Sequence, residues 1–231
     1  MSPKYQLADK RTPPIRPLNV NFPPSTLDSS LYSEISDGAP GSWKRKAFWD
    51  EYVVIMHNTG DQALNITSAE LQDQAGAVRS AGSDPWALER ESKTLEKRYK
   101  DAGIAFSRMA APRIIVSAAE PTVASGVGLG TAGAATAATL SAVALPVYGA
   151  TIFGINMHNR AVIKTEFNRR RVPLPLTLGP GESRTGSFFF PIVPNPQALT
   201  VHWTGSAGDG ETRLDLQFLQ GLHVKGGPRS L

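Results

Sequence analysis

Cysteine is absent from this chain of 231 residues. Its absence excludes disulfide bonds, thiolate metal sites and a cysteine nucleophile, while it leaves the redox compartment open. The N-terminal residues also lack the apolar run of about 7–15 residues that a secretory signal peptide requires. Their polar, proline-rich composition predicts a linker or a strap laid over the surface, because proline fixes φ and removes backbone donors.

Motifs of known catalytic or metal-binding chemistry are also missing. The four histidines show neither HxH nor HExxH spacing, and no GxSxG sequence is present. The glycines after residue 125 lack the Lys-Ser/Thr pair of a phosphate-binding loop. The close carboxylates Asp50–Glu51 and Glu89/Glu91 are expected to be solvated. We therefore expect no catalytic residue, no metal, no cofactor and no enzymatic activity.

The charge balance is only weakly basic, with a net charge of +4 and a pI near 9.4. No basic stripe with interleaved aromatic residues occurs, so nucleic acid is not an expected partner. Hydrophobic residues make up 41% of the chain and charged residues 19%. This composition is typical of a globular protein with a core and excludes general disorder.

Charge is missing altogether from residues 121–159. Small residues recur there at a spacing of three to four, which lets helix backbones approach closely. The candidate helix-packing or membrane residues are Gly126, Gly130, Gly133, Ala150 and Gly154. Residues 122–145 exceed the ~20 residues that span a bilayer. Basic residues lie on both sides, and Arg169, Arg170 and Arg171 form the flank on the C-terminal side.

Three interpretations of this uncharged stretch remain open. It could form a hairpin that inserts into a membrane or packs against other copies, and flanking basic groups on both sides favour this. It could be a helical pair buried within a soluble domain, because Ala, Thr and Gly are only weakly hydrophobic. It could also be a flexible Gly/Ala loop.

Extended patterns lie on both sides of this region. Residues 52–57 form a β-branched and aromatic run, a turn follows at 58–61, and residues 63–71 alternate before a second turn. After residue 173, turns at 179–181 and 205–210 divide the sequence into about four short strands. Neither part has enough strands to bury its own face, so we expect them to form one sheet system.

Two helices are expected between the β parts. An amphipathic helix is predicted over 83–111, with Ser83 or Asp84 as its cap and Pro85 in its first turn. A basic helix is predicted over 159–173, ending before Pro173. The predicted organisation is a proline-rich tether at 1–42, the first part of a β-sandwich at 43–82, a helical insert at 83–173 and the second part of the sandwich at 174–231.

Two stretches resemble a known kind of domain. VVIMHNTGDQALNITSAELQDQAG resembles the first strands of immunoglobulin-like domains of bacterial envelope proteins, and LTLGPGESRTGSFFFPI resembles their later edge. The insert resembles the glycine-zipper segments of such proteins. The proline-rich N-terminus resembles the tether that follows the acylated cysteine of a bacterial lipoprotein; the alternative there is a cytosolic chain with a frayed start. The resemblance implies a mainly β fold: an immunoglobulin-like antiparallel β-sandwich interrupted by a small-residue-rich α-hairpin. Domains of this kind carry no catalytic residues to transfer.

These observations predict a non-enzymatic bacterial envelope protein that is lipid-anchored in the periplasm at the outer membrane. Its sandwich and hairpin would act in binding or assembly, with membrane lipid, other envelope proteins or its own copies as partners. The alternative is a soluble periplasmic carrier that binds a lipid or another hydrophobic ligand between the sandwich and the helices.

Overall fold

The computed structural model describes residues 6–7, 15, 17–39, 41–104, 106–108, 152–206 and 208–225. The fold is mainly β, with antiparallel strands and two helices. The strands are β1 (Gln6–Leu7), β2 (Val20–Asn21), β3 (Leu27–Ile35), β4 (Lys44–Arg45), β5 (Asp50–Asn58), β6 (Leu64–Gln72), β7 (Val78–Ser80), β8 (Leu176–Leu178), β9 (Ser183–Phe190), β10 (Ala198–Gly205) and β11 (Gly208–Asp215). The helices are α1 (Pro85–Asp101) and α2 (Ile152–Arg170), and a short 3-10 helix, η2, covers Gln217–Leu219.

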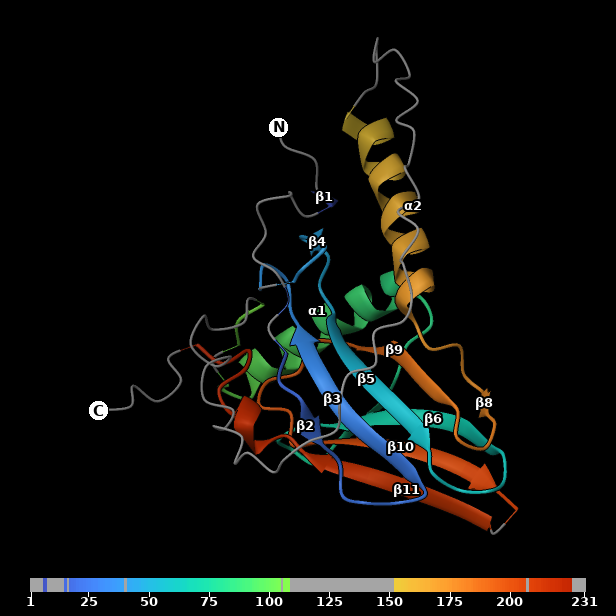
Figure 1. Cartoon of the computed structure of the whole chain (residues 1–231). Coiled ribbons are helices and arrows are strands. Elements are labelled where there is room, and N and C mark those ends of the chain that lie inside the picture. The colour runs from blue at the N-terminus through green and yellow to red at the C-terminus, as the bar shows by residue number, and fades with distance from the viewer. Residues whose placement is uncertain are drawn as a thin grey trace.

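Two larger sheets form the body of the protein (Figure 1). One has the strand order β2-β3-β5-β9, and the other has the order β11-β10-β6-β7 with β8 also paired to β6. Both sheets therefore combine strands from before and after the helices, because β5 pairs with β9 and β6 pairs with β10. The prediction that the two β parts form one system is confirmed. A separate small pair joins β1 to β4.

The prediction of a tether over 1–42 is wrong for its second half. Residues 27–35 form β3, which pairs with β5 along its length. No proline occurs between Pro24 and Pro40, and in this interval Leu27 and Leu31 turn into the core with no exposed surface. Because proline no longer removes backbone donors there, the segment can complete a ladder of hydrogen bonds.

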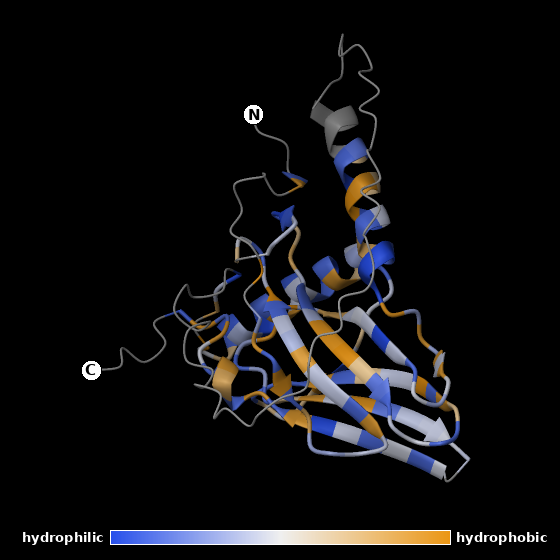
Figure 2. Ribbon diagram, viewed as in Figure 1, coloured by the Kyte–Doolittle hydropathy of each residue, from blue (hydrophilic) through white to orange (hydrophobic). Residues whose placement is uncertain are grey.

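One hydrophobic core lies between the two larger sheets. It combines inward side chains of β3 and β5 with those of β6, β9, β10 and β11. Along β5, for example, Tyr52, Val54 and Met56 are buried while Val53 and Ile55 are only half-buried. Figure 2 shows hydrophobic and hydrophilic bands alternating along the strands. This period of two is what a sheet with one face on the core requires.

Helix α1 begins where the sequence predicts. Asp84 is its cap, and the Asp84 carboxylate accepts a hydrogen bond from the Ala87 amide at 3.0 Å. The helix is shorter than expected, because it ends at Asp101 rather than near Pro112. Gly103 follows with φ 77°, a left-handed conformation that favours glycine and ends a helix.

Replacing Asp84 with alanine is expected to lower the free energy of unfolding by about 1 kcal/mol, because the N-terminal amides of α1 lose their side-chain acceptor. Urea denaturation followed by circular dichroism would measure this change. Asp84→Asn is the matched control, since asparagine also caps helices and retains the stability. Equal losses in both variants would mean that the charge, and not the cap, provides the stabilisation.

Helix α2 begins seven residues earlier than predicted, at Ile152, and ends at Arg170, just before the predicted boundary at Pro173. Figure 1 shows it standing away from the sheets, with its N-terminal end farther from them than its C-terminal end. Ile163 and Phe167, in its C-terminal half, are fully buried. Toward the other end, Met157 has 59% of its surface exposed. The helix is therefore attached to the body by its C-terminal half.

Candidate functional site

The first residues of β5 connect two buried polar groups. Successive side chains of a strand point to opposite faces, so Asp50 and Tyr52 face the core while Glu51 faces α2. Both carboxylates are fully buried, at 0% exposure. The expectation that Asp50 and Glu51 are solvated is wrong, because β5 begins beneath α2 on one side and beneath the C-terminal segment on the other. Glu89 is likewise buried in α1.

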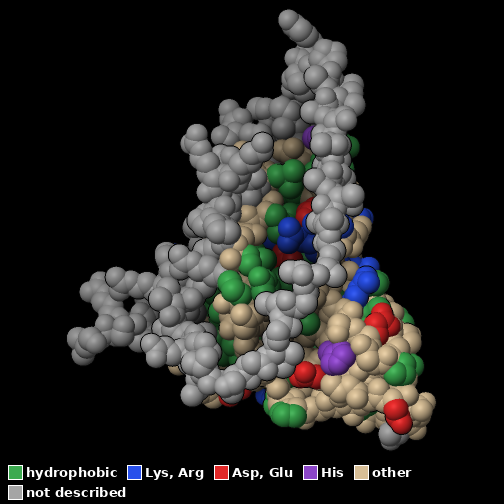
Figure 3. Space-filling model, viewed as in Figure 1, with side chains coloured by type: hydrophobic (Ala, Val, Ile, Leu, Met, Phe, Trp, Pro, Cys, Tyr) green, Lys and Arg blue, Asp and Glu red, His purple; other side chains and the backbone are tan. Residues whose placement is uncertain are grey.

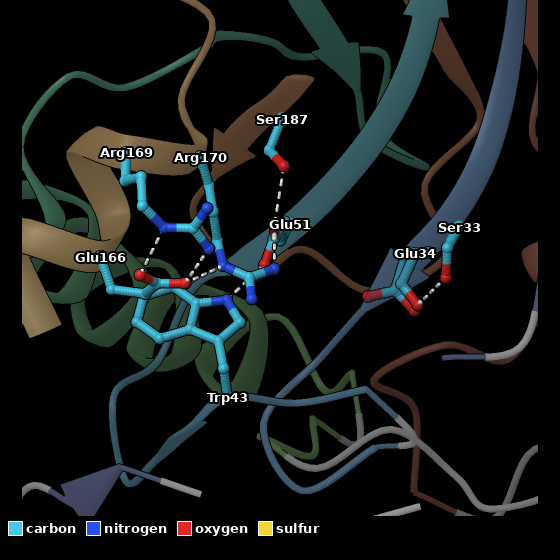
Figure 4. A network of polar contacts seen from close by, with 8 residues as sticks. All are labelled: Ser33, Glu34, Trp43, Glu51, Glu166, Arg169, Arg170 and Ser187. Atoms are coloured by element: carbon cyan, nitrogen blue, oxygen red, sulfur yellow. Dashed lines mark hydrogen bonds and ion pairs between the residues drawn. The ribbon is translucent and has the colours of Figure 1, made fainter. Parts of the chain in front are cut away.

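On the outer face, Glu51 is the centre of a polar network at the base of α2 (Figure 4). We call this group the helix-base network; it comprises Trp43, Glu51, Glu166, Arg169, Arg170 and Ser187. The indole N–H of Trp43 donates to Glu51 Oε2 at 2.6 Å, and the Ser187 hydroxyl donates to Oε1 at 2.6 Å. Arg170 approaches the same Oε1 at 3.4 Å. A buried carboxylate needs such partners, because isolation from water otherwise strongly disfavours its charge.

The arginine side of this network belongs to α2. Arg170 Nε contacts Glu166 at 2.7 Å, and the Arg170 guanidinium lies 5.2 Å from the Trp43 ring centre. Arg169 forms a two-pronged ion pair with Glu166 at 2.8 and 2.6 Å. The hydrogen bond from Arg169 is the largest of the contributions that lower the pKa of Glu166. Arg170 therefore fastens the end of α2 to the sheet.

The predicted basic flank thus lies at the attached end of α2. Ile152 and Arg170 are separated by about 27 Å at 1.5 Å per residue. Of the three flank residues, Arg169 is the most open, with 67% of its side chain exposed. Arg171 forms a backbone bridge to Ser187. On the face drawn in Figure 3, basic side chains lie beside hydrophobic ones.

A cluster of aromatic side chains, which we call the aromatic cluster, fills the space between α2 and the outer face of the sheet; it contains Trp49, Trp86, Phe167 and Phe189. Phe167 of α2 stacks on Phe189 with ring centres 4.1 Å apart, and it meets Trp49 edge-on at 5.9 Å. Trp49 in turn meets Trp86 of α1 at 5.8 Å. Phe189 lies on the outer face, because Phe188 and Phe190 point into the core between the sheets. Both helices are therefore held on the same sheet surface.

On the inner face, a second buried polar group contains Glu34, Asp50 and His223, which we call the inner cluster. His223 Nε2 lies 2.9 Å from Asp50 Oδ2 and 3.5 Å from the Ser36 hydroxyl. Both contacts fall on one ring nitrogen, so the group does not form a Ser-His-Asp relay, which uses both nitrogens. All three members are buried.

Burial sets the protonation of the inner cluster. It raises the pKa of Glu34 to about 8, and the charge of Asp50 adds to the rise while Ser36 opposes it. Burial opposes a charged His223, yet the charge and hydrogen bond of Asp50 raise the pKa of His223 overall. The raised pKa values thus favour the protonated forms of Glu34 and His223.

Lys44 is fully buried, although charged residues are rarely buried without partners. Its ammonium group donates to the carbonyls of Ala47 at 3.0 Å and Trp49 at 2.7 Å. Burial lowers the pKa of Lys44, and the nearby carboxylates, with Asp37 first, oppose this. Lys44 therefore interacts electrostatically with carboxylates of both the inner cluster and the helix-base network.

Most of the predicted packing residues lie outside the described part of the chain. These are Gly126, Gly130, Gly133 and Ala150. Gly154 lies in the first turn of α2, so the one described member of the set is helical. Among the helices of the described residues, none combines the length and the apolar character that a bilayer crossing requires.

Four pockets lined by described residues have volumes of about 110, 200, 270 and 290 Å³. Small-molecule sites usually measure about 300–1,000 Å³. The searches against protein-family models, curated proteins and solved structures gave no match to this chain.

The contacts within both polar groups could not be predicted from the sequence, because the partners are distant along the chain. Glu51 meets Ser187 and Arg170, and Asp50 meets His223, across separations of more than one hundred residues. One signal was available: Asp50 and Glu51 directly precede a run of strand residues, with tryptophans on their N-terminal side. Acidic residues in such an apolar setting indicate paired, buried charges.

Proposed function

We propose that this chain is a non-enzymatic binding or assembly protein of the bacterial cell envelope. An immunoglobulin-like β-sandwich would serve as the body, and α2 as an arm. The arm would present residues 121–151 to a membrane or to other copies of the chain. Support for the sandwich comes from the two antiparallel sheets that share one core.

The attachment of α2 carries this proposal. Its C-terminal half is fixed by Phe167 in the aromatic cluster and by Arg170 in the helix-base network. Its N-terminal end lies away from the sheets (Figure 1). The residue before that end belongs to the uncharged, glycine- and alanine-rich sequence. A segment that adjoins the end of α2 farther from the sheets is well placed to contact a surface outside the body.

This placement changes the role proposed for the arginines. All three lie at the fixed end of α2, where Arg170 and Arg171 contact the sheet, so we assign these two to holding the helix and not to flanking a membrane segment. Arg169 pairs with Glu166 of the same helix. The carrier alternative ranks second, because the four pockets lined by described residues, at about 110 to 290 Å³, are smaller than a typical ligand site.

Vesicle flotation of the full chain and of a variant lacking 121–151 would test the proposal. With vesicles of phosphatidylethanolamine and phosphatidylglycerol, we expect the full chain to float and the deletion to remain at the bottom, because α2 and its contacts are retained while the apolar segment is lost. Sedimentation analysis would be run in parallel, since contact between copies is the other expected outcome.

A Gly126/Gly130→Leu double variant is the matched comparison. It keeps the apolar character, so membrane binding should persist, but it blocks close approach of backbones and should reduce self-association. The proposal is overturned if the full chain neither floats nor self-associates. Lipid that copurifies with a chain that stays monomeric and off vesicles would support the carrier instead.

A further inference from the structure

The inner cluster gathers metal-ligand chemistry from three distant segments. Glu34 is the next-to-last residue of β3, Asp50 begins β5, and His223 follows η2. One ligand atom from each lies within 4.8 Å of the others. Glu34 is the direct cross-strand partner of Tyr52, and Asp50 lies two residues before Tyr52. These side chains therefore share the inner face of one sheet.

His223 is fixed in the orientation of a metal ligand. Its Nδ1 lies 3.0 Å from the carbonyl oxygen of Ser107, and the Ser107 amide donates to the His223 carbonyl at 2.8 Å. The backbone of His223 is left-handed, with φ 59°. A carbonyl partner on one ring nitrogen fixes the ring orientation, as at most metal-binding histidines, and directs Nε2 to Asp50 Oδ2 at 2.9 Å, where a metal ion would take the place of the shared proton. Here Nε2 points into the cluster.

Two buried oxygens beside the cluster lack a hydrogen-bond partner within the described part of the chain. They are Oδ1 of Asp50 and the hydroxyl of Tyr52, and both residues have 0% exposure. Tyr52 lies near both acids, since Glu34 is its cross-strand partner and Asp50 precedes it by two residues on the same face. Burial, together with the charges of Asp50 and Glu34, raises the pKa of Tyr52. Buried polar atoms without partners are rare in native proteins and call for an explanation. A cation between these oxygens would satisfy them.

We propose that Glu34, Asp50 and His223 bind one divalent metal ion, with zinc as the best match and the Tyr52 hydroxyl as an adjacent oxygen. One imidazole nitrogen and carboxylate oxygens suit zinc, whereas magnesium prefers oxygen and water ligands. Bonds of about 2.0–2.2 Å would draw the ligand atoms closer than their present spacing. The ion would join β3, β5 and the C-terminal segment, and its burial assigns it a structural role.

Refolding with metal tests this proposal, because an enclosed site fills most readily as the chain folds. The full chain would be unfolded in urea with chelator, refolded with Zn²⁺, Mg²⁺ or neither, and freed of excess metal by gel filtration. We expect one retained Zn²⁺ per chain by mass spectrometry, no retained Mg²⁺, and a higher unfolding temperature with Zn²⁺ alone. X-ray absorption should show a nitrogen and oxygen shell with a single imidazole.

His223→Gln and Glu34→Gln should weaken Zn²⁺ binding by at least about tenfold. His202→Gln is the matched control, because His202 lies on the surface beside Glu70 and Glu211 and should leave binding unchanged. The proposal is overturned if the wild-type chain retains no Zn²⁺, if its absorption spectrum shows no imidazole or several, or if His202→Gln abolishes retention. Should a cluster variant fail to fold, the wild-type stoichiometry and spectrum still decide.

Discussion

Replacing Phe167 with alanine is expected to lower the free energy of unfolding by about 3–5 kcal/mol. The side chain is fully buried, stacks on Phe189 and meets Trp49 edge-on. Its loss leaves a cavity between the helix and the sheet that the flat sheet surface cannot collapse to fill. Urea denaturation monitored by tryptophan fluorescence would measure the change, since Trp49 borders the cavity.

Met157→Ala is the matched control on the same helix. Met157 is 59% exposed, so its truncation should alter stability by no more than about 0.5 kcal/mol. Limited proteolysis adds a local readout, because α2 should become cleavable in Phe167→Ala before the sheets unfold. A Phe167→Ala loss as small as that of Met157→Ala would show that α2 is not anchored through its aromatic face.

Glu34 is expected to make the metal-free protein less stable as the pH rises. Its pKa is raised from 4.5 to about 8 in the folded chain, so between these values the folded state holds a proton that the unfolded state has released. The free energy of unfolding then falls with increasing pH, by up to about 1.4 kcal/mol per pH unit, and this contribution levels off above pH 8.

Glu34→Gln should remove this slope, because glutamine resembles the protonated acid and does not titrate. The groups facing Glu34 are Ser36, Asp50, His223 and Lys44. The raised pKa of His223 adds a slope of the same sign, whereas the lowered pKa of Lys44 adds one of opposite sign. The difference between wild type and variant, from urea titrations in chelator at several pH values, isolates Glu34. Parallel curves would contradict the prediction.

The strands that the sequence predicted best are those with dense apolar alternation. Residues 52–57 lie within β5, residues 63–71 largely within β6, and the C-terminal part forms the four expected strands. β3 was missed because its buried positions include Ser29, Ser33 and Glu34. Small polar residues at core positions weaken the alternation that identifies a strand. Their burial depends on neighbours that only the folded sheets provide.

The candidate sites were harder to predict than the strands. Lys44, Asp50 and Glu51 look like ordinary surface residues in isolation, because charged residues are rarely buried without partners. Those partners come from elements far along the chain, such as His223 and Arg170. No spacing motif connects residues that only a tertiary fold brings together. The uncharged run could be recognised from composition alone, and its attachment to a fixed helix could not.

The pairing of early strands with late strands has a consequence for the synthesis of the chain. β5 ends at Asn58, but its partner β9 begins only at Ser183. At ~5–20 residues per second, a ribosome needs on the order of ten seconds to make what lies between. During that interval β5 presents an unpaired edge and the apolar segment 121–151 has already emerged. The two larger sheets can be completed only after residues 121–151 have been synthesised. These residues are therefore exposed to the surroundings of the ribosome before the body of the protein has folded.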